Sequence, residues 1–300
     1  MRSKRTVLER RAPKPKAVVS ASQARSTASK VALYIVLIAA SIPFLYPTLW
    51  MFFSSFKPAN EIIMQPPSLL PQRWTLDGFW QIFTAQPFIQ QYGNSIYIAV
   101  IVTSASILLS AMAGYAFARI EFPLRNFFFV LMLAAMMVPS EVTIIPIFTA
   151  VNAMGLNDTH WPLIILPILG PTSVVSVFIF RQHFLGFPKD YEEAARLDGV
   201  SRVGIFFRIA MPLAKPAIAA VGIMAFLRSF NMYFEALIFL RTPENFTLGL
   251  AITRYQDFYG EQMWATQLGA ASLTVIPILV VFLLAQKQFV QGLTQAGLKG

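Results

Sequence analysis

The residue types that carry out most protein chemistry are sparse in this sequence. Its 300 residues include no cysteine and two histidines, His160 and His183, which stand too far apart to suggest a pair of metal ligands. Gly292 and Gly297 have the spacing of a phosphate-binding loop, but Leu298 occupies the position where that loop needs lysine. The sequence therefore predicts no catalytic residue, no metal site and no ATP-binding site in this chain.

Charged side chains gather instead in one segment between two apolar runs, residues 190–216, which reads DYEEAARLDGVSRVGIFFRIAMPLAKP. Its first nine residues are good helix formers. Two adjacent small residues, Ala194 and Ala195, would let the backbone of another protein approach one face of this helix closely. The macrodipole favours anions in the first turn of a helix, where this segment has three acidic residues: Asp190, Glu192 and Glu193.

The same segment contains signals for a turn and a second helix. Gly199 suits the left-handed position that ends a helix, and Ser201 can cap a following helix that extends to Ile209. Pro212 and Pro216 then lead into the next apolar run. We expect two short helices, separated by a sharp turn at Gly199.

The rest of the chain is apolar enough to cross a membrane. Hydrophobic residues make up 56% of the sequence, charged residues 13%, and the mean hydropathy is +0.59. A membrane-spanning helix needs about 20 predominantly apolar residues. Six runs are that long, which predicts an all-α membrane protein with six transmembrane helices, at about 31–53, 94–118, 126–150, 162–184, 214–240 and 266–286.

The net charge of +10 follows the predicted membrane topology. Nineteen of the 24 Lys and Arg residues lie in segments that face one side, and only four lie in the opposite loops. By the positive-inside rule both termini and residues 190–216 are cytoplasmic. Nucleic-acid binding is therefore not expected. Residues 1–30 are basic without apolar periodicity, which predicts a disordered tail near anionic lipid, before a first helix that is not cleaved.

The spacing of residues 193–212 resembles a motif of a known family. Glu193-Ala194-Ala195, three residues, Gly199, nine residues and Ile209, followed after one residue by Met211-Pro212, is similar to the EAA motif of ABC importer permeases, E-A-A-x3-G-x9-I-x-L-P. Met211 replaces the usual leucine, a swap of similar volume.

Other stretches extend this resemblance over about residues 31–300. Asn94-Ser95, AGYAFARIEFP at 113–123 and FVQGLTQAGLKG at the C-terminus are similar to the smaller, MalG-like permease of carbohydrate importers in the maltose and glycerol-phosphate group. The resemblance implies the type I importer permease (MetI-like) fold. It also implies a permease domain at 31–290 with a coupling loop at 185–216, and a C-terminal tail at 291–300 that reaches towards the ATPases. The basic tail at 1–30 is not accounted for by the resemblance.

In such a permease a short helix, here 190–199, seats in a cleft of an ATP-binding subunit, and closure of two such subunits rocks the membrane helices between inward and outward access. The resemblance implies that Glu193 contacts basic groups of the ATPase and that Gly199 permits the sharp turn. The residues expected to couple the chain to the ATPase are Tyr191, Glu192, Glu193, Ala194, Ala195, Leu197, Asp198, Gly199, Ile209 and Pro212.

The resemblance also implies partners and a location. The partners would be a homologous second permease, two ABC ATPases that hold ATP and magnesium, an extracytoplasmic solute-binding protein, a carbohydrate substrate and membrane lipid. The chain itself would carry no cofactor. It would lie in the cytoplasmic membrane of a bacterium or archaeon, with several spans and both termini in the cytoplasm.

Polar residues inside the apolar runs are candidates for the substrate pathway. Charges near the bilayer centre cost about 2.5–3.5 kcal/mol on insertion scales and usually face the bundle interior. The fifth run holds Arg228, Asn231, Tyr233 and Glu235, and the third holds Glu141 between two prolines. One hypothesis is a pathway lined by Asn231, with Glu141 or Glu235 accepting hydrogen bonds from sugar hydroxyls. The other is hydrogen bonding between helices of a permease heterodimer.

Two other functions remain open at this point. An ion-coupled secondary transporter would need a polar relay across several helices and no cytoplasmic docking motif. A membrane scaffold would assemble partners without any pathway. Uptake into liposomes, with and without internal ATP and an uncoupler, distinguishes both from an ATP-driven permease.

Overall fold

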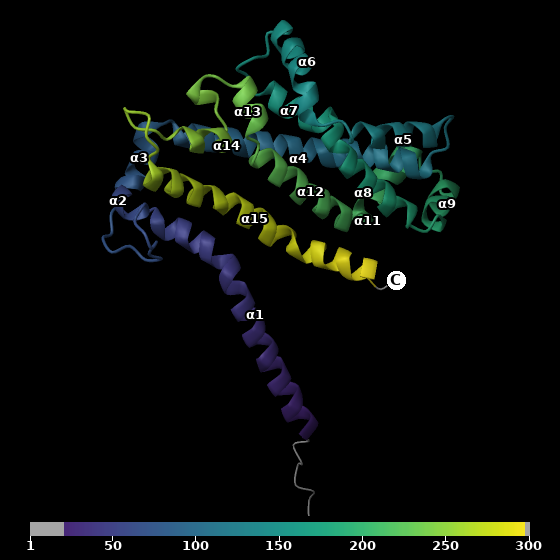
Figure 1. Ribbon diagram of the computed structural model, residues 1–300. Helices are drawn as coiled ribbons and strands as arrows, with labels where there is room; N and C mark the ends of the chain where they lie inside the picture. The colour runs from purple at the N-terminus through teal and green to yellow at the C-terminus, as the bar shows by residue number, and fades with distance from the viewer. Residues whose placement is uncertain (1–20, 298–300) are drawn as a thin grey trace, which may run out of the picture. The chain divides into compact units, whose positions relative to one another are not determined.

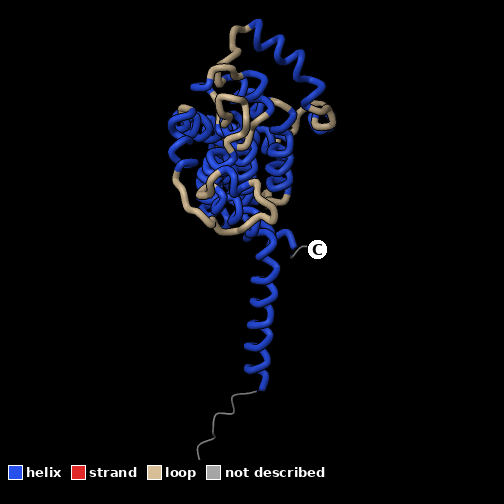
Figure 2. Tube along the Cα trace, turned by 60° about the vertical axis from the view of Figure 1, so that its left-hand side comes forward, coloured by secondary structure: helices blue, strands red, loops and turns tan. Residues whose placement is uncertain are grey.

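Long apolar stretches satisfy their backbone hydrogen bonds internally by forming helices, and the computed structural model of this chain is helical. It describes the backbone of residues 21–297 and the side chains of residues 29–286, Ser140 excepted. Over residues 21–297 the regular elements are all helices, apart from an isolated bridge between Gln256 and Gln262 (Figure 2). This confirms the predicted all-α class. The chain divides into two compact units, Met1–Trp50 and Met51–Gly300.

Most of the first unit belongs to helix α1 (Ala21–Ser54), which continues to the start of the second unit. Residues 29–54 are long and apolar enough to cross a membrane. Residues 21–30, which the sequence assigned to the disordered tail, are helical here. Residues 1–20 of the predicted tail lie outside the described residues.

The second unit contains the remaining helices in chain order: α2 (Ala59–Ile62), α3 (Asp77–Ala85), α4 (Phe88–Arg119), α5 (Arg125–Ala135), α6 (Ser140–Ala153), α7 (Trp161–Leu169), η1 (Pro171–Ser173), α8 (Val174–Leu185), α9 (Asp190–Leu197), α10 (Arg202–Ile205), η2 (Phe206–Ala210), α11 (Met211–Leu213), α12 (Lys215–Phe230), α13 (Phe234–Phe239), η3 (Pro243–Asn245), α14 (Leu248–Ala251), η4 (Ile252–Arg254) and α15 (Trp264–Gly297). The predicted C-terminal tail is helical through Gly297, and residues 298–300 lie outside the described range.

Helix α4 is the central element of the second unit. It packs along α8 and α12, with further contacts to α7, and α12 lies between α4 and α15 (Figure 1). The α4–α8 crossing is close because Gly114 has no side chain. A Cβ atom there would stand 2.6 Å from Cβ of Phe180 and 2.8 Å from the backbone nitrogen of Arg181.

The six predicted spans appear in three forms. Residues Ser29–Ser54, Phe88–Arg119 and Trp264–Gln286 are long enough to cross a membrane as single helices. Two more candidate spans are bent pairs, Trp161–Leu169 with Pro171–Leu185 at 50° and Arg202–Leu213 with Lys215–Phe230 at 79°. The predicted third run forms two shorter helices, α5 and α6.

Proline accounts for the division of the third run. Pro139 has no N–H to donate, and it adopts an extended conformation directly before α6 (φ −61°, ψ 138°). The fifth run also differs from the prediction, because α12 ends at Phe230 and α13 begins only at Phe234.

A hydrogen-bonded turn at Asp158 fixes the connection between α6 and α7. The Asp158 carboxylate accepts hydrogen bonds from the backbone N–H groups of Arg241 (2.9 Å) and Thr242 (3.0 Å) and from the Thr242 hydroxyl. Its backbone carbonyl accepts one from the Asn245 side chain (2.8 Å). Burial would raise the pKa of Asp158, but these hydrogen bonds to the charged form prevail and lower it to about 2.

Substitution of Gly114 tests the close α4–α8 crossing. Gly114→Leu should destabilise the second unit by roughly 1–3 kcal/mol, because the two helices must separate. Gly93 lies in the same helix and has no atom within 4 Å of the position that a Cβ would take, so Gly93→Leu should change little. Thermal unfolding of the detergent-purified protein measures both. Equal melting temperatures for the two variants would contradict the close crossing.

The turn at Asp158 predicts a pH dependence. Since its folded pKa lies below the unfolded value of about 3.9, the stabilisation is complete above the unfolded pKa and is lost as the pH falls from about 4 towards 2. The melting temperature of the wild type should therefore fall over this range more steeply than that of Asp158→Asn. Glu244→Gln removes an exposed carboxylate from the neighbouring loop and should retain the wild-type slope; an unchanged slope in Asp158→Asn would refute the assignment.

Candidate functional site

The predicted short helix of the charged segment is present as α9, with three acidic residues in its first turn. It ends as the sequence indicates, because Gly199 adopts φ +76° and no atom lies within 4 Å of the position a Cβ would take. The backbone N–H of Gly199 donates to Arg196 (3.0 Å), and that of Val200 donates to Ala195 (2.9 Å). Glycine is thus needed at residue 199 for its backbone conformation rather than for space.

The second predicted helix also begins where expected. The Ser201 hydroxyl accepts a hydrogen bond from the backbone N–H of Gly204 at 3.2 Å, which caps α10. The helical path then continues past the predicted end at Ile209 to Leu213 and bends by 79° into α12. Ile209 is half-buried and Pro212 is exposed. Residues 202–213 therefore connect the surface segment directly to a membrane helix.

Helix α9 has one exposed and one buried face. Its exposed side chains include apolar groups, and Leu197 is 89% exposed. Glu192 and Ala195 instead point into the chain and are buried. Two adjacent alanines were expected to form a small exposed face on this helix. Only Ala194 lies at the surface, because Ala195 is buried. The exposed members of the predicted coupling set are Tyr191, Glu193, Ala194, Leu197, Asp198, Gly199 and Pro212.

A buried ion pair holds α9 against the end of α4. Nε of Arg119 lies 3.3 Å from Oε1 of Glu192, and the two side chains are 6% and 7% exposed. Because the Nε–H is not directed at a hydrogen-bond acceptor, this contact is an ion pair, whereas another guanidinium nitrogen donates to the carbonyl oxygen of Phe187. Tyr115, also on α4, lies close enough to Glu192 for the two side chains to interact electrostatically.

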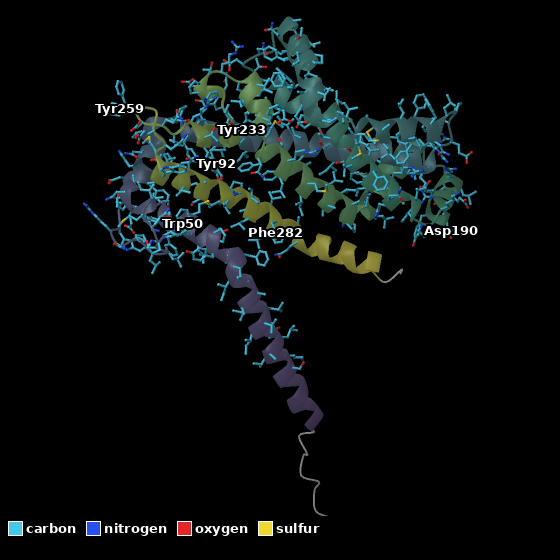
Figure 3. The ribbon with its side chains drawn as sticks, in the orientation of Figure 1. Trp50, Tyr92, Asp190, Tyr233, Tyr259 and Phe282 are labelled. Carbon is cyan, nitrogen blue, oxygen red and sulfur yellow. The ribbon has the colours of Figure 1, made fainter. Side chains whose placement is uncertain are left out.

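Aromatic packing continues this attachment into the core. The Tyr115 ring lies 5.5 Å from that of Phe184 on α8 and 5.4 Å from that of Phe206 in η2. Phe180, Phe184 and Phe206 belong to one buried cluster with small residues of α4 and α12. The charged segment is thus joined to α4, α8 and α12 at the end of the second unit marked by Asp190, far from Tyr259 at the opposite end (Figure 3).

Sequence reasoning missed the part played by Arg119 and Tyr115. Both lie in the stretch AGYAFARIEFP, yet nothing in its pattern indicates contact with a helix that follows two apolar runs later. Glu192 was expected at the interface with an ATPase because it neighbours Glu193. The structure shows why the two differ: adjacent helical residues point about 100° apart, and only Glu192 faces α4.

The predicted pathway residues are not gathered on one helical face. Asn231 caps the C-terminus of α12, and its side chain donates to the carbonyl oxygen of Leu227 at 2.9 Å. Tyr233 is exposed between α12 and α13, Glu235 is half-buried in the first turn of α13, and Glu141 is exposed in the first turn of α6. The predicted fifth span, 214–240, is therefore not one continuous helix, because α12 ends at Phe230 and α13 begins at Phe234.

A cavity of about 260 Å³ lies in the bundle, with a lining that is mostly apolar but includes several polar side chains. It forms where the α7–α8 span breaks at η1, between α4 and the last turns of α12, and none of the four predicted pathway residues lines it. Its polar lining consists of Ser106, Thr172, Ser173, Ser176 and Arg228. Nη1 of Arg228 donates to the carbonyl oxygen of Thr172 at 3.1 Å.

These features define the class of protein. The chain combines several apolar helices that can span a membrane, broken spans with polar groups at the breaks, and a polar helix at one end that is joined to a membrane helix. These are the features of an integral membrane protein whose helices can bend around a cavity.

Comparison with known proteins identifies the family. Residues 106–295 match the family "Binding-protein-dependent transport system inner membrane component". The chain is 37% identical over 258 residues to the arabinooligosaccharides transport system permease protein AraQ of Halalkalibacterium halodurans, covering 85% of this chain and 91% of that one. It is 30% identical over 282 residues to the maltodextrin transport system permease protein MdxG of Bacillus subtilis, covering 94% and 100%.

A solved structure has the same fold. The crystal structure of a bacterial ABC transporter involved in the import of the acidic polysaccharide alginate contains a chain that is 21% identical, with a TM-score of 0.74 over 91% of this chain and 100% of that chain. The chain described here belongs to the binding-protein-dependent family of ABC importer permeases. It is a membrane permease subunit and not an enzyme, since ATPase activity in such importers resides on partner subunits.

Variants of Arg119 test the attachment of α9 to α4. Arg119→Met should cost up to about 3–5 kcal/mol, because it removes the buried partner of the Glu192 carboxylate and leaves only a long, solvent-exposed contact with Arg196. Arg196 also pairs with Glu192, at 3.8 Å, but it is 52% exposed, so Arg196→Ala should cost at most about 1 kcal/mol.

The double variant Arg119→Met with Glu192→Met removes both buried charges and should recover much of the loss. Thermal unfolding in detergent gives the comparison. A loss for Arg119→Met no greater than that for Arg196→Ala would contradict the structural role of the buried pair.

Proposed function

We propose that this chain is one permease subunit of an ATP-driven importer for a carbohydrate or related polyol, coupled to an ATPase through α9. The substrate class is supported by the relatives, since AraQ and MdxG are named for arabinooligosaccharides and maltodextrin. The observation that supports the coupling role best is the exposed face of α9. Glu193, Ala194 and Leu197 lie at the surface of a helix that the buried pair fixes to the membrane bundle.

The exposed face of α9 suits a protein partner more than lipid or water. Leu197 is an almost fully exposed apolar side chain beside charged ones, and Tyr191 is exposed while its ring stacks on Phe187 at 5.2 Å. Apolar groups at the centre of a polar rim are typical of interface surfaces. A cleft of an ATPase would bury Leu197 and Ala194, and its basic groups would pair with Glu193.

Movement would pass from α9 into the bundle by two connections. The covalent one is the continuous helical path Arg202–Leu213, which bends into α12. The lateral one is the Arg119–Glu192 pair, which joins α9 to α4. Alternating access follows when the ATPases close and both connections displace the membrane helices together.

The remaining parts of the complex complete this proposal. A homologous second permease would form the pathway with this subunit, two ATPases would bind ATP and magnesium, and the solute-binding protein would deliver substrate to the outer face. The family name supports the binding protein. The distribution of Lys and Arg supports a cytoplasmic location for both termini and α9.

Charge reversal at Glu193 tests the docking surface. Glu193→Lys should lower uptake and co-purification of the ATPase at least tenfold at normal membrane abundance, because it places a cation against basic groups of the partner. Glu121→Lys makes the same charge change at an exposed residue of the α4–α5 loop and should leave both measurements unchanged. Normal ATPase binding and uptake in Glu193→Lys would disprove the docking assignment.

Gly199 offers a second test within the same experiment. Gly199→Val should uncouple ATP hydrolysis from uptake, because a β-branched residue is strained at φ +76°. Gly199→Asn is the matched control, since asparagine tolerates this conformation and no neighbouring atom obstructs its Cβ.

ATP-dependent uptake into liposomes that withstands an uncoupler would also separate this function from an ion-coupled carrier or a scaffold.

A further inference from the structure

We propose that the cavity at the α7–α8 break is a binding site for a negatively charged group on the carried solute, and that Arg228 is its counter-charge. The inference rests on the proposed import function and adds a substrate class to it: a carbohydrate that bears a carboxylate, sulfate or phosphate. The cavity residues that carry the argument are Ser106, Thr172, Ser173, Ser176 and Arg228.

Arg228 lies within a candidate membrane span and has no acidic partner among the described residues. It belongs to the last turn of α12, in the bent pair Arg202–Leu213 and Lys215–Phe230. In the described part of the chain no carboxylate oxygen lies within 4.0 Å of its guanidinium, and both ion pairs found there involve Glu192. Arg228 is exposed in this subunit, and an ionisable residue within a membrane span usually faces a polar cavity or pathway and finds a partner of opposite charge there. The cavity at the α7–α8 break is the space that Arg228 lines.

The neighbouring groups orient Arg228 without neutralising it. The Thr172 carbonyl accepts one hydrogen bond from Nη1, which leaves most of the five guanidinium N–H donors for another ligand. The end of α12 contributes a partial negative charge, as does any helix C-terminus. Both effects are smaller than that of a full counter-ion, and the hydrogen bond holds one guanidinium nitrogen beside Thr172 at the edge of the cavity.

The other polar groups of the cavity are hydroxyls. Ser173 donates to Gly170 (2.8 Å) and Thr172 donates to Pro167 (3.4 Å), so both are turned towards the broken backbone. Ser106 and Ser176 are buried side chains on α4 and α8. The rest of the lining is apolar, from residues such as Val102, Met224 and Leu227. Its polar part, one cation and several hydroxyls without a carboxylate, matches an anionic group that is flanked by sugar hydroxyls.

The cavity volume limits what binds there. About 260 Å³ lies just below the usual range of ligand pockets, so the site admits one charged monosaccharide unit rather than a whole oligosaccharide. Bidentate geometry with a carboxylate or a sulfate is available to arginine but not to lysine. We therefore expect Arg228 to select one charged unit as a chain passes through the bundle.

Competition uptake by the complete importer tests this inference. The complex and its binding protein are placed in liposomes with internal ATP. They are offered a mixture of neutral xylo-, arabino- and malto-oligosaccharides together with their uronate-bearing counterparts, and the contents are read by mass spectrometry. The wild type should accumulate uronate-bearing oligosaccharides preferentially, and Arg228→Gln should lower their uptake about tenfold or more.

Two further variants separate charge from folding. Arg228→Lys keeps the charge and should restore part of the uptake, while losing the bidentate geometry. Arg241→Gln removes an exposed arginine outside both the cavity and the coupling segment and should behave as the wild type. Co-purification of the second permease is measured for each variant and should be normal.

Three results would overturn the inference. One is uptake of uronate-bearing oligosaccharides that is unchanged in Arg228→Gln, or ATP-driven accumulation of neutral oligosaccharides alone by the wild type; either would leave the proposed import function intact. Another is loss of the second permease from Arg228→Gln complexes, because the missing counter-charge would then belong to that subunit. The third is the absence of ATP-driven uptake of any carbohydrate, which would remove the proposed function itself.

Discussion

The buried ion pair between Arg119 and Glu192 is the interaction on which the arrangement of this permease depends. It joins the last turn of α4, the helix around which the second unit is packed, to α9, a short surface helix that otherwise has few buried residues. Burial of two charges is stabilising only if both stay paired. A displacement of α9 must therefore carry the end of α4 with it or leave a charge unpaired in a poorly hydrated environment.

The membrane imposes the second constraint. Backbone groups within a bilayer must be satisfied internally, so interruptions of a helix are tolerated only where protein or a polar cavity surrounds them. The interruptions among the described residues include those between α5 and α6, between α7 and α8, between α11 and α12, and between α12 and α13. Arg228, Thr172 and Ser173 lie at two of them. The same breaks that allow the spans to bend thus also supply the polar groups of the cavity.

Much of the charged segment could be predicted from sequence because its signals are local. Gly199 and Ser201 act through their own backbone and side-chain preferences, and the structure confirms the turn at one and the helix cap at the other. The burial of Glu192 and the end of α12 at Phe230 could not be read this way. The first depends on Arg119 in a distant helix, and the second on a break that apolar composition conceals, since the run stays hydrophobic through Leu240.

The proposed coupling requires that α9 presents Glu193, Ala194 and Leu197 to an ATPase while Ala195 faces its own chain. Because the chain has no cysteine, single cysteines can be introduced at residues 193, 194, 195 and 197 and treated with a short thiol-to-amine cross-linker in the assembled importer. We expect cross-links to the ATPase from residues 193, 194 and 197 and none from residue 195. Cross-linking from residue 195 alone, or from none of the four in a complex that still hydrolyses ATP, would contradict the docking of α9 on the ATPase.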